Sequence, residues 1–151
     1  MDILVFSDSH GQTAPMIQTI RNTAPDLVLH LGDYTRDAKF LQKTFPDLPI
    51  RMVSGNCDFN SKTPDLEEFL LSDKKIIMTH GHRYQVKQGY DSLCTMGRCA
   101  GADILLFGHT HIPYHGRIGN MHILNPGPAH QSCALIRIAD GDISCEHLTL
   151  K

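Results

Sequence analysis

The feature that most constrains the fold of this chain is a series of short, uninterrupted apolar runs that alternate with helical patterns. Residues 3–7 form the first run, and residues 26–31 and 50–54 form the next two. A continuous apolar run of this length is typical of a strand that is covered on both faces. A helical pattern at residues 38–45 separates the second run from the third. The order strand, helix, strand predicts βαβ units and a parallel sheet.

Two further helices are expected from capping residues and apolar spacing. Thr13 is a candidate N-cap residue, and Pro15 suits the first turn of the helix that follows. Met16 and Ile20 then fall on one face of this helix. Apolar residues recur at helical spacing over residues 86–100, which predicts another helix there.

The second half of the chain is richer in strand patterns joined by tight turns. Residues 69–71 and 75–79 flank a short polar segment and predict a hairpin. The dipeptide Asp140-Gly141 is a strong hairpin signal between two further strands. The C-terminal third is therefore predicted to be mostly antiparallel, and two packed sheets with helices outside are the simplest architecture. Its strands are expected at residues 104–107, 114–118, 121–124, 133–138 and 143–150.

Composition limits the class of protein. The chain has 151 residues, of which 41% are hydrophobic and 20% are charged. These values predict one globular domain over residues 1–151 with a substantial core. The formal net charge of −2 weakens long nucleic acid or an anionic membrane as a partner, whereas a small phosphate ester stays open.

The first residues and the cysteines indicate the compartment. Asp2 stands where a signal peptide would carry basic residues, and the apolar run that follows is too short to span a membrane. The five cysteines are an odd number and lack the spacing of a disulfide framework. We therefore expect reduced thiols in a cytoplasmic protein.

Polar residues with glycine neighbours follow five of the expected strands. Ligands bind beyond the carboxyl ends of strands in open α/β sheets, so these side chains are expected to converge on one crevice. Carboxylate, amide and imidazole groups suit divalent transition metals, and there are too many of these groups for one ion. The five segments are Asp8-Ser9-His10-Gly11, Gly32-Asp33, Gly55-Asn56-Cys57-Asp58, His80-Gly81-His82 and Gly108-His109-Thr110-His111.

These motifs, in this order, resemble those of the calcineurin-like metallophosphoesterases, over a stretch that extends from Asp8 to Pro128. The compact length and the segments around Asn56 and His80 are most similar to the small bacterial and archaeal phosphodiesterase branch. The resemblance implies an α/β fold, a four-layer α/β/β/α sandwich of two mixed β-sheets flanked by helices. It also implies two metal sites: Asp8, His10 and His111 for the first metal, Asn56, His80 and His109 for the second, and Asp33 as the bridge.

The expected cofactors are two divalent transition-metal ions, with manganese as the first expectation and nickel, zinc or iron as alternatives. A water that bridges two dications has its pKa lowered toward neutrality, so a hydroxide is available near pH 7. This hydroxide is expected to attack the phosphorus of a small phosphate-ester substrate. The N-terminus of the helix that begins near Thr13 could add its dipole to phosphate binding.

One residue departs from the pattern of the larger phosphatases in this family. Those enzymes place a histidine after the asparagine, where it assists the leaving group, and here that residue is Cys57. Either His82 or a metal-bound water replaces it, or the natural substrate has a leaving group that needs little help. Catalytic roles are therefore expected for Asp33, Asn56 and His82, with a surface histidine as the alternative for His82. The missing histidine favours phosphodiesters over phosphomonoesters.

Other classes of function are weaker. A weakly active interaction scaffold on the same fold, similar to a retromer subunit, is the main alternative, but all seven expected metal ligands are retained. A nuclease would be expected to carry basic runs with interleaved aromatic residues, which are missing. A homo-oligomer formed through the C-terminal strands or residues 67–71 stays open.

The remaining histidines and cysteines receive structural interpretations. His30 lies within an expected buried strand and is predicted to be a satisfied core histidine. Cys94 and Cys99 would face different directions on a helix, which argues against a zinc site. The segment Asn125-Pro126-Gly127-Pro128 is predicted to be a turn in the pocket wall. Four histidines have no partner motif and are expected to be surface or strand residues: His115, His122, His130 and His147.

Overall fold

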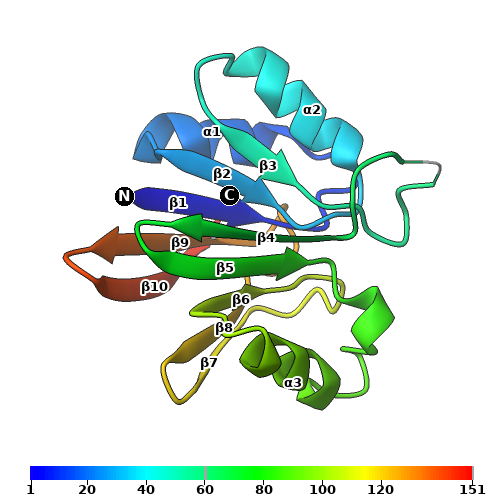
Figure 1. The fold of residues 1–151 in the computed structure, drawn as a ribbon. Coiled ribbons are helices and arrows are strands. Elements are labelled where there is room, and N and C mark those ends of the chain that lie inside the picture. Colours follow the sequence, from blue (N-terminus) through cyan, green and yellow to red (C-terminus); the bar gives the residue numbers. More distant parts are fainter. Residues whose placement is uncertain (60, 151) are drawn as a thin grey trace.

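The computed structural model describes residues 1–59 and 61–150, which form two five-stranded sheets with helices on the outside (Figure 1). The first sheet has the strand order β10-β9-β1-β2-β3, and the second has the order β4-β5-β6-β8-β7. The elements of the first half are β1 (Asp2–Phe6), α1 (Ala14–Thr23), β2 (Leu27–His30), α2 (Thr35–Thr44), β3 (Ile50–Met52), β4 (Leu66–Leu71) and β5 (Lys74–Thr79). Those of the second half are the 3-10 helix η1 (His82–Tyr84), α3 (Asp91–Cys99), β6 (Ile104–Leu106), β7 (Tyr114–Ile118), β8 (Met121–Asn125), β9 (Ser132–Ala139) and β10 (Asp142–Thr149).

The first sheet contains the predicted βαβ units. β1, β2 and β3 are parallel, and α1 and α2 connect them. β9 pairs antiparallel with both β1 and β10, which confirms the predicted C-terminal hairpin. Thr13 occupies the N-cap position of α1, although its side chain makes no capping hydrogen bond. The outer face of this sheet is apolar, and Leu4, Phe6, Met16 and Leu41 are fully buried there.

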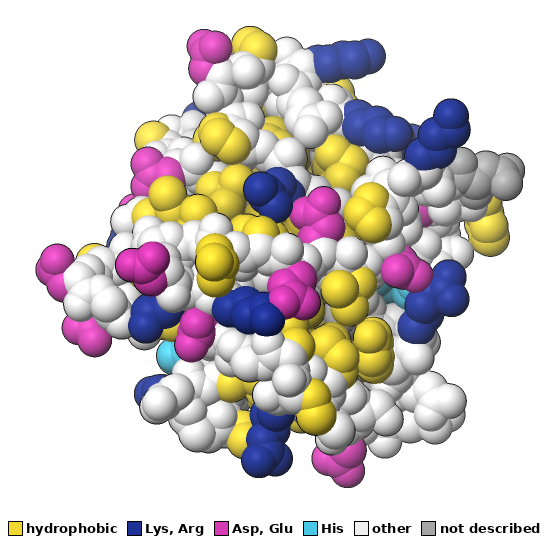
Figure 2. Space-filling view, viewed as in Figure 1, with side chains coloured by type: hydrophobic (Ala, Val, Ile, Leu, Met, Phe, Trp, Pro, Cys, Tyr) yellow, Lys and Arg dark blue, Asp and Glu magenta, His cyan; other side chains and the backbone are white. Residues whose placement is uncertain are grey.

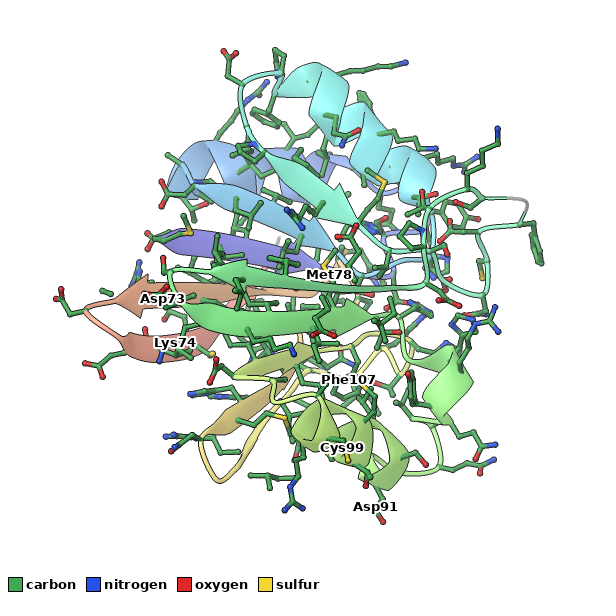
Figure 3. The ribbon with its side chains drawn as sticks, in the orientation of Figure 1. Asp73, Lys74, Met78, Asp91, Cys99 and Phe107 are labelled. Atoms are coloured by element: carbon green, nitrogen blue, oxygen red, sulfur yellow. The ribbon has the colours of Figure 1, made fainter. Side chains whose placement is uncertain are left out.

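The second sheet begins with the predicted β4–β5 hairpin. β6 and β8 then run parallel to β5, and β7 pairs antiparallel with β8. The pairing of β6 with β8 is an exception to the antiparallel pattern predicted for this region. It arises because the chain passes to the edge as β7 and returns as β8 between β7 and β6. α3, which runs from Asp91 to Cys99 in Figure 3, covers the outer face together with the buried Phe107.

An apolar core separates the two sheets. Ile3 and Val5 belong to this core, whereas Leu4 and Phe6 belong to the layer under the helices. This division follows because neighbouring residues in a strand point to opposite faces. Met78 of β5, labelled in Figure 3, enters the core from the second sheet. Both faces of β1 are therefore covered, and the predicted four-layer α/β/β/α sandwich is confirmed.

Two helix predictions were wrong at their boundaries. The helix expected over residues 86–100 is shorter, since α3 begins only at Asp91. Before it, Gln85 and Gly89 have φ angles of 55° and 144°, and backbone of this kind interrupts a helix. α2 begins at Thr35, three residues before the predicted start. No helix in the described part of the chain is long and apolar enough to cross a membrane.

Candidate metal centre

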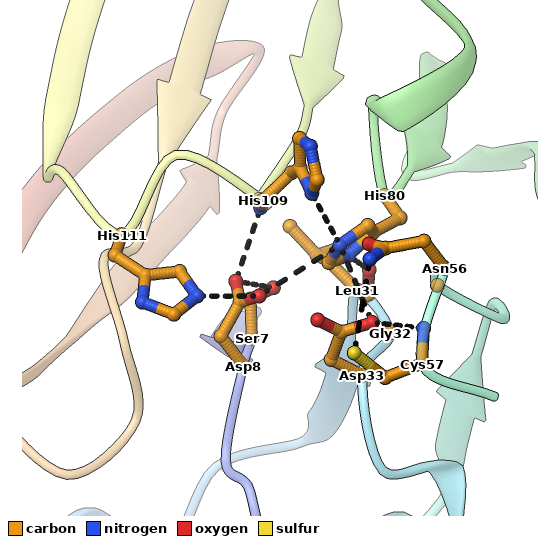
Figure 4. A network of polar contacts seen from close by, with 12 residues as sticks. Ser7, Asp8, Leu31, Gly32, Asp33, Asn56, Cys57, His80, His109 and His111 are labelled. Carbon is orange, nitrogen blue, oxygen red and sulfur yellow. Dashed lines mark hydrogen bonds and ion pairs between the residues drawn. The ribbon is translucent and has the colours of Figure 1, made fainter. Parts of the chain in front are cut away.

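The carboxyl ends of five strands meet at one end of the sandwich. β1, β2 and β3 of the first sheet and β5 and β6 of the second sheet lead into loops on this side (Figures 1 and 4). The structure thus brings together strand ends that are up to about a hundred residues apart in the sequence. The loops carry all the residues proposed from sequence for the site: Asp8, His10, Asp33, Asn56, His80, His82, His109 and His111.

Asp8 is fully buried at the centre of this site. Its Oδ2 accepts hydrogen bonds from the Ser7 hydroxyl (2.6 Å) and from the backbone N–H of His109 (3.1 Å). Its Oδ1 is buried without a hydrogen-bond partner among the described residues. This oxygen lies 3.3 Å from His111 Nε2 and 3.7 Å from His80 Nε2. A buried carboxylate oxygen without a donor is costly, and a cation bound between it and the imidazoles would satisfy it.

Asp33 lies between two groups of imidazoles and is only 2% exposed. Its Oδ2 lies 3.7 Å from His10 Nε2, and its Oδ1 lies 3.5 Å from His80 Nε2. Oδ1 also accepts the backbone N–H of Cys57 at 2.9 Å. Burial raises the pKa of Asp33, but the nearby His80 and the Cys57 N–H outweigh burial, and the pKa falls below its ordinary value. The carboxylate is therefore ionised and presents one oxygen to each side.

His80 is held in a defined orientation. It is fully buried, and its Nδ1 lies 2.9 Å from the carbonyl oxygen of Leu31. A carbonyl can only accept, so Nδ1 carries the proton and the Nε2 lone pair is free to face the site. Nε2 lies 3.2 Å from His109 Nδ1. Burial, followed by the charges of His80 and Lys87, lowers the pKa of His109 to about 4, so this imidazole is neutral at pH 7.

The donor atoms fall into two groups that share Asp33. Asp8, His10, Asp33 and His111 each offer an atom within 4.8 Å of the others, a spacing that suits one ion. His80 lies near the other oxygen of Asp33, Oδ1, and His109 lies beside His80. Asn56 is exposed. Among the described residues, its side chain makes one hydrogen bond, which Nδ2 donates to Cys57 Sγ at 3.7 Å. Figure 4 draws Asn56 beside His80.

His82 reaches the same site from η1. Its ring centroid lies 5.5 Å from that of His80 and 6.1 Å from that of His109. Its Nδ1 is buried without a hydrogen-bond partner within the described residues. Burial first, and then the charge of His80, lowers the pKa of His82. His82 therefore lies beside the other histidines of the site, and its catalytic role stays a prediction.

The backbone of the site is strained. Asp8, His10, Asp33, His109 and His111 all have φ between 47° and 71°, in the left-handed region. Each such residue costs about 1–3 kcal/mol, so strain is kept only where the surroundings impose it. Glycine is required where loops touch: a Cβ on Gly108 would lie 2.0 Å from Ser7 Oγ, and one on Gly55 would lie 2.3 Å from Asp33 Oδ1. This concentration of strain in five donor residues is typical of a functional site.

Sequence reasoning assigned no role to Asp58, which supports the site from behind. Its Oδ2 accepts the backbone N–H groups of Asp33 (2.9 Å) and Gly55 (2.7 Å). Its Oδ1 accepts those of Tyr34 and Thr35, both at 2.8 Å. One carboxylate thus ties the loop after β3 to the loop after β2 and to the start of α2. The only sequence signal was its place within the Gly55-Asn56-Cys57-Asp58 segment.

A second supporting network confirms His30 as a satisfied core histidine. His30 is fully buried, and its Nδ1 accepts the Gly32 backbone N–H at 3.2 Å. Its Nε2 then donates to Ser9 Oγ at 2.9 Å, and Ser9 donates to Asp37 Oδ2 at 2.7 Å. Burial lowers the pKa of His30 to about 4. This neutral imidazole holds the loops after β1 and β2 together beneath the donor residues.

The turn after β8 also braces the site. The Asn125 side chain donates through Nδ2 to the Gly108 carbonyl (3.1 Å) and to Thr110 Oγ1 (3.0 Å). Its Oδ1 accepts the backbone N–H of Gly127 at 2.9 Å. Asn125 therefore positions the loop that carries His109 and His111.

A cavity of about 630 Å³ opens beside His10 and Cys57. Arg36 and Lys39 of α2 line it on one side, and the Arg36 guanidinium lies 4.5 Å above the Tyr34 ring. Lys and Arg side chains gather at this end of α2 in Figure 2. Burial first, and then the charge of Asp33, raises the pKa of Cys57, so its thiol stays protonated. This cavity adjoins the metal centre, and Arg36 and Lys39 give it positive charge that suits an anionic substrate.

Three of the four histidines without partner motifs lie in strands, as predicted. These are His115, His122 and His147, and each has a contact that the sequence does not indicate. His115 Nε2 lies 3.0 Å from His122 Nδ1, and His147 Nε2 donates to the carbonyl of Asn125 at 2.7 Å. The pairing of β7 with β8 brings His115 to His122, whereas His147 and Asn125 lie on strands of different sheets. His130 lies in the turn before β9.

Comparisons with known proteins concern the family and the fold of the chain. The family model described as "Calcineurin-like phosphoesterase superfamily domain" matches residues 1–140. The probable metallophosphoesterase YsnB of Bacillus subtilis is 36% identical over 131 residues, which are 84% of this chain and 74% of that protein. The phosphodiesterase MJ0936 of Methanocaldococcus jannaschii is 25% identical over 147 residues, covering 84% and 83% of the two chains. The structure of Vps29 from Entamoeba histolytica in complex with zinc covers 99% of both chains with a TM-score of 0.79, and at 23% identity this likeness shows the fold alone.

Proposed function

Since the chain belongs to the calcineurin-like phosphoesterase superfamily, and is thus a metal-dependent hydrolase of phosphate esters, we propose that it cleaves small phosphodiesters at a pair of divalent metal ions. The observation that carries the proposal is the position of Asp33. It is ionised and buried, and it lies between two groups of expected metal-ligand side chains. One ion on each side of this carboxylate would satisfy both groups.

The donor set fits two such ions. Asp8, His10 and His111 would hold the first ion, and the buried Oδ1 of Asp8, which has no hydrogen-bond partner in the described part of the chain, supports this assignment. The second ion would be held by Asn56, His80 and His109, with Asp33 shared between the two. The donors are oxygen and nitrogen atoms, which agrees with manganese as the first expectation and with nickel, zinc or iron as alternatives. Bound there, the ions supply a hydroxide nucleophile near neutral pH and neutralise charge on the phosphate.

The chain's own residues set the geometry of the reaction. The Leu31 carbonyl fixes the tautomer of His80 and aims its Nε2 at the site. Asp58 fixes the backbone of Asp33. His82 lies near His80, and its buried Nδ1 has no hydrogen-bond partner within residues 1–59 and 61–150, so it can give or take a proton at the leaving group.

The preference for diesters rests on the leaving-group side and on the cavity. Cys57 stands where a histidine acid stands in larger relatives, and its raised pKa makes it a poor proton donor. A leaving group that needs little protonation is therefore favoured. The cavity of about 630 Å³ is larger than a bare phosphate requires, and Tyr34 and the 85% exposed Phe59 offer apolar surface to a second substituent. Arg36 and Lys39 would attract the anionic ester.

The direct test compares a diester with a monoester. Metal-stripped protein is assayed with bis-p-nitrophenyl phosphate and p-nitrophenyl phosphate, with Mn, Ni, Zn, Mg or no metal added back. We expect faster turnover of the diester, only with a transition metal, and loss of turnover in Asp33→Asn. Asp91→Asn on the surface of α3 is the matched control and should keep full activity. Preference for the monoester would reject the diester assignment and leave the phosphoesterase intact.

The similarity to Vps29 makes an interaction scaffold the second candidate. The scaffold would bind metal without efficient turnover. Retention of all seven expected donor residues favours the enzyme. Protein that binds two ions and hydrolyses neither ester with any of the metals would instead support the scaffold.

A further inference from the structure

A second group of metal-binding side chains lies away from the metal centre, where the two sheets approach each other. His115 comes from β7, His122 from β8 and Cys145 from β10. β7 and β8 belong to the second sheet and β10 to the first, so the group joins β10 at the edge of one sheet to the edge strand β7 and its neighbour β8 in the other (Figure 1). His122 lies three residues before Asn125, or about 10 Å before the end of β8 that braces the metal centre.

The three donor atoms are already close together. His115 Nε2 lies 3.0 Å from His122 Nδ1, and the same Nδ1 lies 3.9 Å from Cys145 Sγ. All three atoms lie within 4.8 Å of one another. The two imidazole rings are stacked, with an interplanar angle of 12° and centroids 5.3 Å apart. Donor atoms from three strands therefore meet here, although no local sequence motif predicts their contact.

These separations are near those of a tetrahedral zinc site. Zinc bonds of about 2.0–2.1 Å to nitrogen and about 2.3 Å to sulfur place two nitrogens about 3.3 Å apart, and a nitrogen and a sulfur about 3.5 Å apart. The observed 3.0 Å and 3.9 Å differ from these values by a few tenths of an ångström, within the reach of small side-chain rotations. His115 is exposed, so water can reach the site on the side of β7 and supply a fourth ligand.

The protonation states suit a soft cation. Burial, and then neighbouring charges that include Arg117, lowers the pKa of both His115 and His122, so both imidazoles are neutral at pH 7. Burial raises the pKa of the Cys145 thiol to about 11, so a bound cation has to displace its proton. Zinc does this, since a thiol that coordinates zinc is deprotonated outright. Hard ions such as Mg²⁺ or Ca²⁺ do not suit two imidazoles and a thiolate.

We propose that His115, His122 and Cys145 form a second, separate binding site for Zn²⁺ that clips β10 of the first sheet to β7 and β8 of the second. Cys145 packs against the core between the sheets, so an ion here would close the edge of that core. Its role is structural, and it takes no part in phosphate-ester hydrolysis. The proposal does not depend on the substrate proposed above.

Cobalt distinguishes the two sites, because only this one pairs a thiolate with imidazoles outside the catalytic loops. Co²⁺ is titrated into metal-stripped full-length protein while the near-ultraviolet charge-transfer band of a Co²⁺–thiolate bond is recorded. Because the two proposed catalytic ions also take up Co²⁺, we expect the band to saturate by three equivalents, at an intensity that corresponds to one Co²⁺–thiolate site per chain, and to vanish when excess Zn²⁺ is added. The band should be absent from Cys145→Ser and His122→Ala. In His115→Ala, at an exposed strand position, the affinity for cobalt should fall at least tenfold.

Cys57→Ser is the matched control, because Cys57 is the cysteine beside the proposed catalytic ions. It should keep the band, while Cys145→Ser keeps turnover of bis-p-nitrophenyl phosphate and a wild-type circular dichroism spectrum. Zn²⁺ should also raise the melting temperature of the wild type more than that of Cys145→Ser. A band that is absent from the wild type, persists in Cys145→Ser, or disappears in Cys57→Ser overturns the proposal.

Discussion

Replacing Asp58 tests whether one carboxylate holds together the loops that present the metal centre. Four backbone N–H groups donate to it at 2.7–2.9 Å. Each bond to a charged acceptor contributes about 1.5 kcal/mol, and water can replace part of this because Asp58 is half-buried. Asp58→Asn keeps one oxygen and so about half of the bonds. The free energy of unfolding should fall by about 2–3 kcal/mol in Asp58→Asn and by about 4–5 kcal/mol in Asp58→Ala.

The assay is urea unfolding in parallel with turnover of bis-p-nitrophenyl phosphate. One kcal/mol shifts the melting temperature of a chain of this size by about 2–4 °C, so Asp58→Asn should melt about 4–12 °C lower. Because Asp33 loses its backbone restraint, kcat should fall much more than KM changes. Asp26→Asn is the matched control: it accepts one exposed N–H, from Asp2 at 2.7 Å, and should lose less than about 1 kcal/mol. The expected loss in Asp58→Ala is at least ~4 kcal/mol. If its free energy of unfolding is instead within about 1 kcal/mol of the wild-type value and its kcat is unchanged, the reasoning is refuted.

Three other predictions follow from the site and its supports. Because His30 is buried with a pKa of about 4, the unfolded chain binds more protons than the folded chain below pH 6.5, and His30 should account for about 2–3 kcal/mol of the stability that metal-free protein loses between pH 7 and pH 4.5. In urea unfolding, His30→Gln should therefore lose about 2–3 kcal/mol less than the wild type over this pH range. Gly108→Ala places a Cβ 2.0 Å from Ser7 Oγ, so it should abolish turnover and lower the melting temperature sharply. Gly101→Ala is the control, because its Cβ meets nothing within 4 Å, and its free energy of unfolding should fall by only about 1 kcal/mol, the cost of a left-handed backbone. Arg36→Ala and Lys39→Ala each remove positive charge from the cavity, so in steady-state assays each should raise KM for the diester about tenfold with little change in kcat. Lys43→Ala on the same helix is the control and should change neither constant.

The local sequence determined the strands and their order. The uninterrupted apolar run in β1 required cover on both faces, and the structure covers it with helices on one side and a second sheet on the other. The turn signals at residues 72–74 and at Asp140-Gly141 were equally local, and both hairpins were confirmed. Since parallel strands end on the same side of a sheet, the convergence of the loops after them could also be predicted.

Boundaries and supports depended on contacts between distant segments. α3 begins late because Gln85 and Gly89 adopt left-handed backbone that apolar spacing does not reveal. Asp58 binds N–H groups across a gap of more than twenty residues, and its role follows from the approach of two loops. Whether the residues on these loops hold two ions stays a prediction, which metal analysis can test.

The group formed by His115, His122 and Cys145 shows most clearly what only the tertiary structure decided. Its members are separated by seven and twenty-three residues, far from the regular spacing of a zinc motif. They meet because β7 pairs with β8 within one sheet and β10 of the other sheet packs beside them. Periodicity along a chain specifies which face of a strand is buried. It does not specify which strand of a second sheet will lie against that face, because sheet packing is set by the sum of many weak apolar contacts.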